Sequence, residues 1–144
     1  MTENNKETVN ETTNESSNQT DNTATSTGLD QNIAGLLTYL FGIITGIIFV
    51  VIEKENRFVR FHAWQSIFVW AAIFITFIVL FIGGFIIGLI PGIGWILGIF
   101  IWLFEIVLGL GTFILWIFLM IQAFQNKEFK LPLIGEYAEK QVNK

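Results

Sequence analysis

The fold class is decided by the long apolar stretch from Phe61 to Phe124, which reads FHAWQSIFVWAAIFITFIVLFIGGFIIGLIPGIGWILGIFIWLFEIVLGLGTFILWIFLMIQAF. It carries a single formal charge, on Glu105. An apolar run of about 20 residues already matches the hydrocarbon core of a bilayer, which is about 30 Å thick. The stretch is too long for one such helix, so it predicts two membrane spans in an all-α integral membrane protein.

Glycine and proline divide this stretch. Gly83-Gly84 and the sequence Pro91-Gly92-Ile93-Gly94 favour breaks, because proline removes a helical hydrogen bond and glycine is a weak helix former. We therefore predict spans over about residues 63–82 and 98–124. The segment between them is expected to be an interfacial hairpin, a re-entrant loop or part of a broken fourth span, with its non-helical backbone shielded from lipid.

Another span is predicted upstream, from Ile33 to Ile52. These residues carry no charge, and a helix of this length measures about 30 Å. Asp30, just ahead of the run, is expected to cap its start and to favour the positive end of its dipole. The fold prediction is thus three transmembrane helices, with four as the alternative.

The overall composition agrees with a membrane protein and argues against an enzyme. The chain has 144 residues, of which 53% are apolar and 14% charged, with no cysteine and one histidine. A disulfide framework, an iron–sulfur cluster and a zinc finger are therefore excluded. Because no nucleophile elbow, phosphate loop or zinc-binding helix motif occurs, we predict no catalytic, cofactor-binding or metal-binding residues.

The N-terminal residues 1–28 have a different character. The first thirty residues hold six acidic residues and one basic residue, and they are rich in threonine and asparagine. Such a segment has too little apolar surface to offset the entropy lost on ordering. We predict that residues 1–28 are a disordered acidic tail and that the transmembrane domain covers residues 29–140.

The distribution of basic residues predicts the topology. Three follow the first predicted span and four follow the last one (Lys54, Arg57, Arg60, Lys127, Lys130, Lys140 and Lys144). Because lysine and arginine favour the cytoplasmic side, both groups are expected there, in a multi-pass protein of the cell membrane. Three spans then place the N-terminus outside and the C-terminus in the cytoplasm, whereas four would export the C-terminal lysines.

Small side chains recur every four residues in the first predicted span. They are Ala34, Thr38, Gly42 and Gly46. On one continuous helix this spacing forms a row that lets another helix approach closely. The row is expected to pack within this protein or, alternatively, to form a homodimer seam.

The stretch from Arg57 to Ser66, RFVRFHAWQS, combines basic, aromatic and polar residues. Helical spacing divides them between two faces. Arg57, Arg60, Phe61 and Trp64 share one face, and Glu55, His62, Gln65 and Ser66 share the other. The first face is typical of an anchor to lipid headgroups, and the second is expected to point into the bundle.

Two ionisable residues are candidates for a function inside the membrane. His62 is interpreted either as the centre of a substrate or proton site or as a structural histidine bonded to a neighbouring carbonyl. Glu105 costs about 2.5–3.5 kcal/mol inside hydrocarbon if it has no partner. With three spans we expect it near the backbone of the glycine-rich segment and far from Arg60, whereas with four spans it would lie at the cytoplasmic boundary beside the arginine residues. In either case a structural hydrogen-bonding role is expected.

The C-terminal residues 132–142 are predicted to form a short surface helix. Pro132 suits its first turn, and Ile134, Tyr137, Ala138 and Gln141 recur at helical spacing. The helix is expected to lie on the cytoplasmic membrane surface, and a docking motif for a soluble partner is the alternative.

Three segments carry a resemblance to a known family. They are LDQNIAGLLTYL from Leu29, IEKENRFVRFHAWQS from Ile52 and KLPLIGEYAEK from Lys130. They resemble the corresponding parts of a family of small uncharacterised archaeal and bacterial membrane proteins, which is grouped distantly with the Tic-type chloroplast protein-import component. The resemblance implies a membrane protein of three or four helices and brings no established activity.

The sequence thus predicts a non-enzymatic integral membrane protein, an accessory or scaffold subunit that packs through faces of small residues. The alternative is an oligomeric pore or transporter for ions, small solutes or polypeptide. The predicted partners are the lipid bilayer and either further copies of the chain or another membrane protein, with no nucleic acid. A pore would need several copies, because one chain offers few polar groups to line it.

Overall fold

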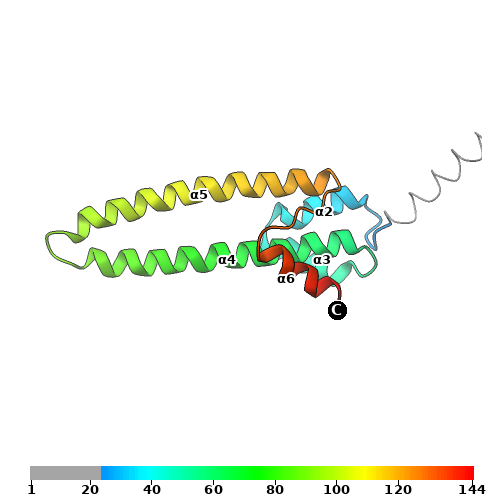
Figure 1. Ribbon diagram of the computed structural model, residues 1–144, viewed down its shortest axis with the longest axis horizontal. Coiled ribbons are helices and arrows are strands. Elements are labelled where there is room, and N and C mark those ends of the chain that lie inside the picture. The colour runs from blue at the N-terminus through cyan, green and yellow to red at the C-terminus, as the bar shows by residue number, and fades with distance from the viewer. Residues whose placement is uncertain (1–23) are drawn as a thin grey trace, which may run out of the picture.

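The computed structural model describes residues 24–144, and this part of the chain forms five α-helices and no strand (Figure 1). The helices are α2 (Gln31–Leu40), α3 (Ile43–Ile52), α4 (Arg57–Gly88), α5 (Gly94–Phe124) and α6 (Ile134–Val142). The predicted all-helical class is therefore confirmed for the described residues. Most of the predicted disordered tail lies outside them, but residues 24–28 form a turn that contacts the helical domain.

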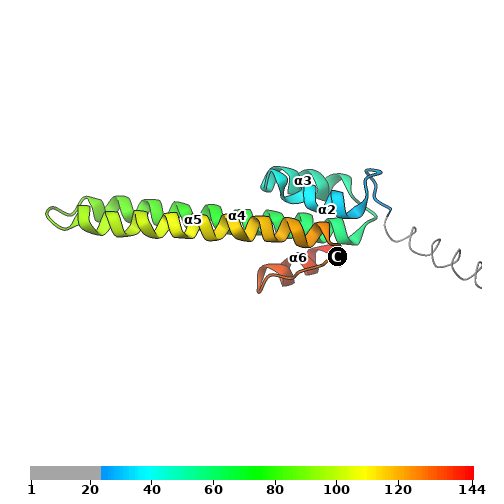
Figure 2. The ribbon, with the colours of Figure 1, turned by 90° about the horizontal axis from the view of Figure 1, so that it is seen from above.

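Helices α4 and α5 form a long antiparallel pair (Figures 1 and 2). They have 32 and 31 residues, so each is between about 45 and 50 Å long. Within residues 24–144 these are the two helices long and apolar enough to cross a membrane. Most of their large apolar side chains are exposed, as expected for helices that face lipid.

The glycine-rich segment is more helical than predicted. α4 continues through Gly83-Gly84 to Gly88, and the chain turns over residues 89–93, where Gly92 has a φ of 85°. A helical glycine costs about 1 kcal/mol relative to alanine, whereas an unsatisfied backbone group in lipid costs several. The predicted boundaries at residues 82 and 98 are therefore wrong, and residues 83–97 form a helix end, a tight turn and a helix start.

The predicted single helix over residues 33–52 is also wrong. The chain breaks at Phe41-Gly42 into α2 and α3, and each has 10 residues, too few to span a bilayer. Gly42 makes the turn with φ 62° and ψ −125°, a conformation that residues with a Cβ rarely adopt. The Thr45 hydroxyl donates to the Thr38 carbonyl at 3.0 Å across the break, which satisfies one backbone acceptor there.

The two short helices form a hairpin that returns to its starting point. Its first end is fixed by Gln31, whose Nε2 donates to Asn126 Oδ1 at 3.0 Å. Its tip lies on α4, where the Ser66 hydroxyl donates to the Gly42 carbonyl at 3.3 Å and a Cβ at Gly42 would meet the Trp70 ring. α3 then leads back to Glu53. Both ends of the hairpin therefore lie at the same end of the α4–α5 pair.

We call this end of the molecule the base, formed by residues 24–30, 53–56 and 125–133 and the helix ends beside them. α6 lies there as well, and packs on α4 where Phe61 contacts Ala138 and Val142. α2, α3 and α6 thus cover the base half of the α4–α5 pair, and the other half extends beyond them (Figure 2). The placement of residues 24–30 beside the start of the C-terminal segment disagrees with the predicted opposite placement of the two termini.

Candidate functional site

The predicted polar residues Arg57, Arg60, His62 and Gln65 all lie in the first turns of α4, at the base. α4 begins there because the Asn56 side chain accepts a hydrogen bond from the Val59 amide at 3.1 Å, as an N-cap does. Asn56 Nδ2 also donates to Gln31 Oε1 at 3.1 Å. The same residue therefore starts α4 and ties α2 to it.

His62 is fully buried in the base. Its Nδ1 lies 3.2 Å from the Tyr39 hydroxyl of α2. The rings of Phe58 and Phe61 pack against it, with centroid distances of 4.5 and 5.3 Å. The imidazole is thus enclosed by aromatic rings and bonded to a hydroxyl at Nδ1, while its buried Nε2 has no hydrogen-bond partner among the described residues. Both interpretations of His62 stay predictions.

Two hydrogen bonds from side chains to backbone extend this polar cluster. Gln65 Nε2 donates to the Phe129 carbonyl at 3.0 Å, and Trp116 Nε1 donates to the Tyr39 carbonyl at 2.8 Å. The first bond joins α4 to the loop before α6, and the second joins α5 to α2. Together with the contact between Tyr39 and His62, they fix the relative positions of α2, α4 and α5.

Glu53 is a buried carboxylate that the sequence pattern did not mark as a candidate. It accepts hydrogen bonds from the Ser26 amide at 2.8 Å, the Ser26 hydroxyl at 2.9 Å, the Asn56 amide at 2.9 Å and the Glu55 amide at 3.2 Å. Burial would raise the pKa of Glu53, but these hydrogen bonds outweigh it and hold the pKa below its ordinary value. The sequence feature that could have marked Glu53 is its position three residues before Asn56, the N-cap of α4.

Ion pairs connect the start of α4 with the C-terminal segment. Arg57 contacts Glu128 at 2.8 Å and Glu139 at 3.4 Å, and Lys130 contacts Glu139 at 2.8 Å. The hydrogen bond from Lys130 is the main reason that the pKa of Glu139 lies below its ordinary value. Partly exposed pairs of this kind add little to stability because solvent screens them, so they orient the segment more than they stabilise it.

The small residues predicted to form one row are divided by the break in the helix. Ala34 and Thr38 are buried on α2, Gly42 forms the turn and Gly46 is buried on α3. A Cβ at Gly46 would lie 2.8 Å from the Ile67 side chain and 3.1 Å from the Ala63 carbonyl. The row is therefore in contact with α4 of the same chain, so it is not free to form a homodimer seam.

Glu105 is half-buried on α5, in a shallow groove that also contains Phe81, Gly84 and Gly98. Phe81 lies 21 positions after Arg60 on the continuous helix α4, which corresponds to about 30 Å. Glu105 is therefore beside the glycine-rich segment and far from the arginine residues.

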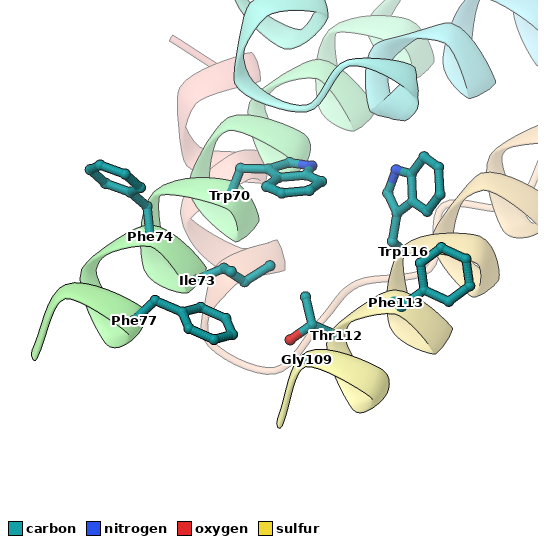
Figure 3. Close-up of a pocket in the computed structure, with 8 residues that line it drawn as sticks. All are labelled: Trp70, Ile73, Phe74, Phe77, Gly109, Thr112, Phe113 and Trp116. Carbon is teal, nitrogen blue, oxygen red and sulfur yellow. The ribbon is translucent and has the colours of Figure 1, made fainter. Parts of the chain in front are cut away.

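A separate apolar cavity of about 410 Å³ lies between α4 and α5, next to the tip of the α2–α3 hairpin (Figure 3). Trp70 and Phe77 border it from α4, and Thr112 and Trp116 border it from α5. Its lining offers almost no polar groups to orient a ligand. Within residues 24–144, moreover, no group of three or more acidic, histidine or cysteine side chains could hold a metal ion.

Comparison of the sequence with known proteins identifies its family. Residues 20–138 match the sequence model of the "Magnetosome magnetite crystal formation protein family". A UPF0132 membrane protein of Methanocaldococcus jannaschii is 43% identical over 112 residues, which cover 78% of this chain and 88% of that protein. The chain belongs to the UPF0132 family of membrane proteins. A UPF0132 protein of Archaeoglobus fulgidus is 41% identical over 79% of this chain and 97% of its own length.

These relatives confirm that the chain is a membrane protein and that it resembles small archaeal membrane proteins. The further link to the Tic-type import component stays a prediction. No solved structure matches this UPF0132 protein.

The low pKa of Glu53 predicts how the stability of this UPF0132 protein depends on pH. A carboxyl group whose pKa is lowered by folding stabilises the folded state above its unfolded pKa of about 4.3, and this contribution is lost as the pH falls through the folded value. We expect the melting temperature in detergent to be constant from pH 7 to 5 and to fall below about pH 4. Circular dichroism measures it, and a Glu53→Gln variant with an equally steep acid dependence would contradict the assignment to Glu53.

Proposed function

We propose that this UPF0132 protein is a non-enzymatic scaffold, which uses its base as a fixed anchor and presents the far half of the α4–α5 pair to another membrane protein. The observation that supports this is the surface of that half. Beyond the hairpin tip, α4 and α5 contact each other, and no other described helix covers them (Figure 2). A Cβ at Gly83, Gly88 or Gly98 would meet nothing within 4 Å, so a partner helix has room to approach closely.

The proposed topology has two spans and a re-entrant hairpin, the latter formed by α2 and α3. The base carries the basic residues of both loops, whereas the turn at residues 89–93 carries no charge. By the preference of lysine and arginine for the cytoplasm, the base lies on the cytoplasmic side. Residues 24–30 and the C-terminus then share that side, and α2–α3 enters the membrane without crossing it.

Labelling of single cysteines tests this topology, because the chain has no cysteine of its own. In intact cells an impermeant maleimide should label Ile90→Cys, whereas Leu29→Cys and Asn143→Cys should react after permeabilisation. Labelling of Leu29→Cys in intact cells, with Asn143→Cys protected, would instead support three spans.

Photo-crosslinking tests the scaffold proposal. A photoreactive residue in place of the exposed Trp102, one turn after Gly98, should give an adduct with a different membrane protein that also co-purifies with the chain, and one at buried Ala63 should not. Gly83→Leu should weaken the adduct and leave the melting temperature unchanged, because its side chain enters open space. An adduct of equal strength in Gly83→Leu, or the same adduct from Ala63, would contradict the proposal.

An oligomeric pore is the second candidate, and Glu105 is the observation that favours it. Glu105 is the one ionisable side chain between His62 and the end of α5, and it is half-exposed on a face that otherwise meets lipid. A ring of such carboxylates in an oligomer would favour cations. Selective flux in liposomes that Glu105→Gln abolishes would support a pore, and absence of flux would support the scaffold.

Substitutions at Glu105 should affect insertion very differently. Glu105→Gln keeps the size and the hydrogen-bonding capacity of the side chain, so folded yield should stay near that of the wild type. Glu105→Lys places a cation in α5, where α4 and α5 offer no other acid, at a cost of about 2.5–3.5 kcal/mol. Size-exclusion chromatography of the solubilised protein measures folded yield. If Glu105→Gln lowers the folded yield as much as Glu105→Lys does, the negative charge of Glu105 itself is needed for folding.

A further inference from the structure

The helices α3 and α6 lie on opposite sides of the α4–α5 pair (Figure 2). Both pack against the base half of α4. From α3, Phe49 joins the apolar cluster that contains Phe58 and Ala63, and from α6, Ala138 joins the cluster that contains Phe61. The two helices therefore flank the same stretch of α4, and they would meet the same depth of membrane if the pair stood upright in the bilayer.

The exposed faces of these two helices suit different surroundings. α3 carries no charge, and its exposed side chains are all aliphatic, namely Ile44, Ile47, Ile48, Val51 and Ile52. The exposed side chains of α6 are Glu136, Tyr137 and Lys140. The face of α3 therefore favours hydrocarbon, whereas the two charges of α6 favour water or lipid headgroups.

The positions of these side chains along α4 sharpen the contrast. Ile134, at the start of α6, packs against the cluster that contains Val69 and borders a pocket with it. Glu136 follows two positions later, whereas Val51 lies closer to the base, because α3 runs toward the base after Phe49. In an upright pair Glu136 would thus lie deeper in the membrane than Val51, which is costly for a carboxylate.

The length of α4 also disagrees with an upright orientation. From Phe61 to the helix end at Gly88, α4 measures about 42 Å, and the hydrocarbon core of a bilayer is about 30 Å thick. A hydrophobic helix that is too long accommodates by tilting, and tilts of up to about 40° occur. At about 40° this part of α4 covers about 32 Å of bilayer thickness, so a tilt removes the mismatch.

We propose that the α4–α5 pair crosses the bilayer at a tilt of about 40°, with its α3 side turned toward the bilayer centre and its α6 side toward the water. The exposed face of α6 then lies on the headgroups of the leaflet whose hydrocarbon surrounds α3. Tyr137 lies at the level that tyrosine favours, and Lys140, whose Nζ is 5.3 Å from the centroid of that ring, faces the lipid phosphates. Because α6 packs over Phe61 and Trp64, its own face replaces the headgroup anchor predicted for those residues.

Electron paramagnetic resonance of the full chain in liposomes of phosphatidylcholine and phosphatidylglycerol tests the tilt. Spin labels are attached to Val51→Cys and Glu136→Cys, which are both exposed, in a chain without other cysteines. Oxygen should relax the label at position 51 several-fold more than a water-soluble nickel chelate does, as at the reference site Ile82→Cys in the far half of α4. The label at position 136 should show the reverse. Equal depths, or a deeper label at position 136, would overturn the proposal.

A nickel-chelating lipid distinguishes headgroup contact from a face that meets a soluble partner. It should relax the label at position 136 strongly, because its nickel is held at the headgroups. Relaxation by the soluble chelate without relaxation by the nickel lipid would show that α6 faces away from the membrane, and would also overturn the proposal. If either variant fails to fold, Ile47→Cys and Tyr137→Cys provide a second pair on the same faces. None of these readings depends on the scaffold function or on which leaflet holds the base.

Discussion

Replacing Gly42 by alanine should lower the free energy of unfolding by about 3 kcal/mol or more. Two causes add. At φ 62° and ψ −125° a residue with a Cβ is strained, and the Cβ would lie 2.8–2.9 Å from three atoms of the Trp70 ring. The tip of the α2–α3 hairpin would therefore lift from α4. Thermal unfolding in detergent should show a melting temperature lower by about 10 °C.

Gly98→Ala is the matched control for this substitution. Gly98 is helical, its Cβ would meet nothing within 4 Å, and alanine is the better helix former. The melting temperature should stay the same or rise slightly. If Gly42→Ala and Gly98→Ala behave alike, the turn at Gly42 is not the feature that holds the hairpin.

Replacing Glu53 by alanine should cost about 3 kcal/mol. The substitution removes the acceptor of four hydrogen bonds, from Ser26, Glu55 and Asn56, and it leaves the buried amide of Asn56 unsatisfied. The turn at residues 24–28 should detach, because Ser26 supplies two of those bonds. Limited proteolysis should then cut the chain near Ser26 faster, and thermal unfolding should report the loss of stability.

Glu55→Ala separates the loss of this network from the loss of a charge. Glu55 lies in the same loop and is exposed, and such surface substitutions change stability by about 0.5 kcal/mol or less. Unchanged proteolysis at Ser26 in Glu53→Ala would show that the turn is held by other contacts.

The sequence predicted the helical class and the two long spans, because an apolar run of that length has few other solutions in a membrane. It did not predict the break at Gly42. A helix that spans the bilayer and a hairpin that turns back within it can have the same hydropathy. In addition, Gly42 fitted the predicted row of small packing residues. What decides between them is the contact with Trp70, which lies 28 positions further along the chain.

The polar base was predictable in part. The placement of Arg57, His62 and Gln65 at the start of one helix followed from their spacing. The partners of His62 and Gln65, namely Tyr39 and the Phe129 carbonyl, come from segments far away in the chain, and no local pattern contains them. Glu53 was missed for a related reason, since a loop glutamate after an apolar run is usually exposed to solvent.

The contacts of the α2–α3 hairpin have a consequence for how the protein is made. Synthesis proceeds from the N-terminus, so residues 31–52 leave the ribosome before the chain contains α4, on which Gly42 and Gly46 pack. Until then the hairpin lacks the surface that holds its tip. The α2–α3 hairpin therefore docks only after α4, which follows it in the chain, has been made.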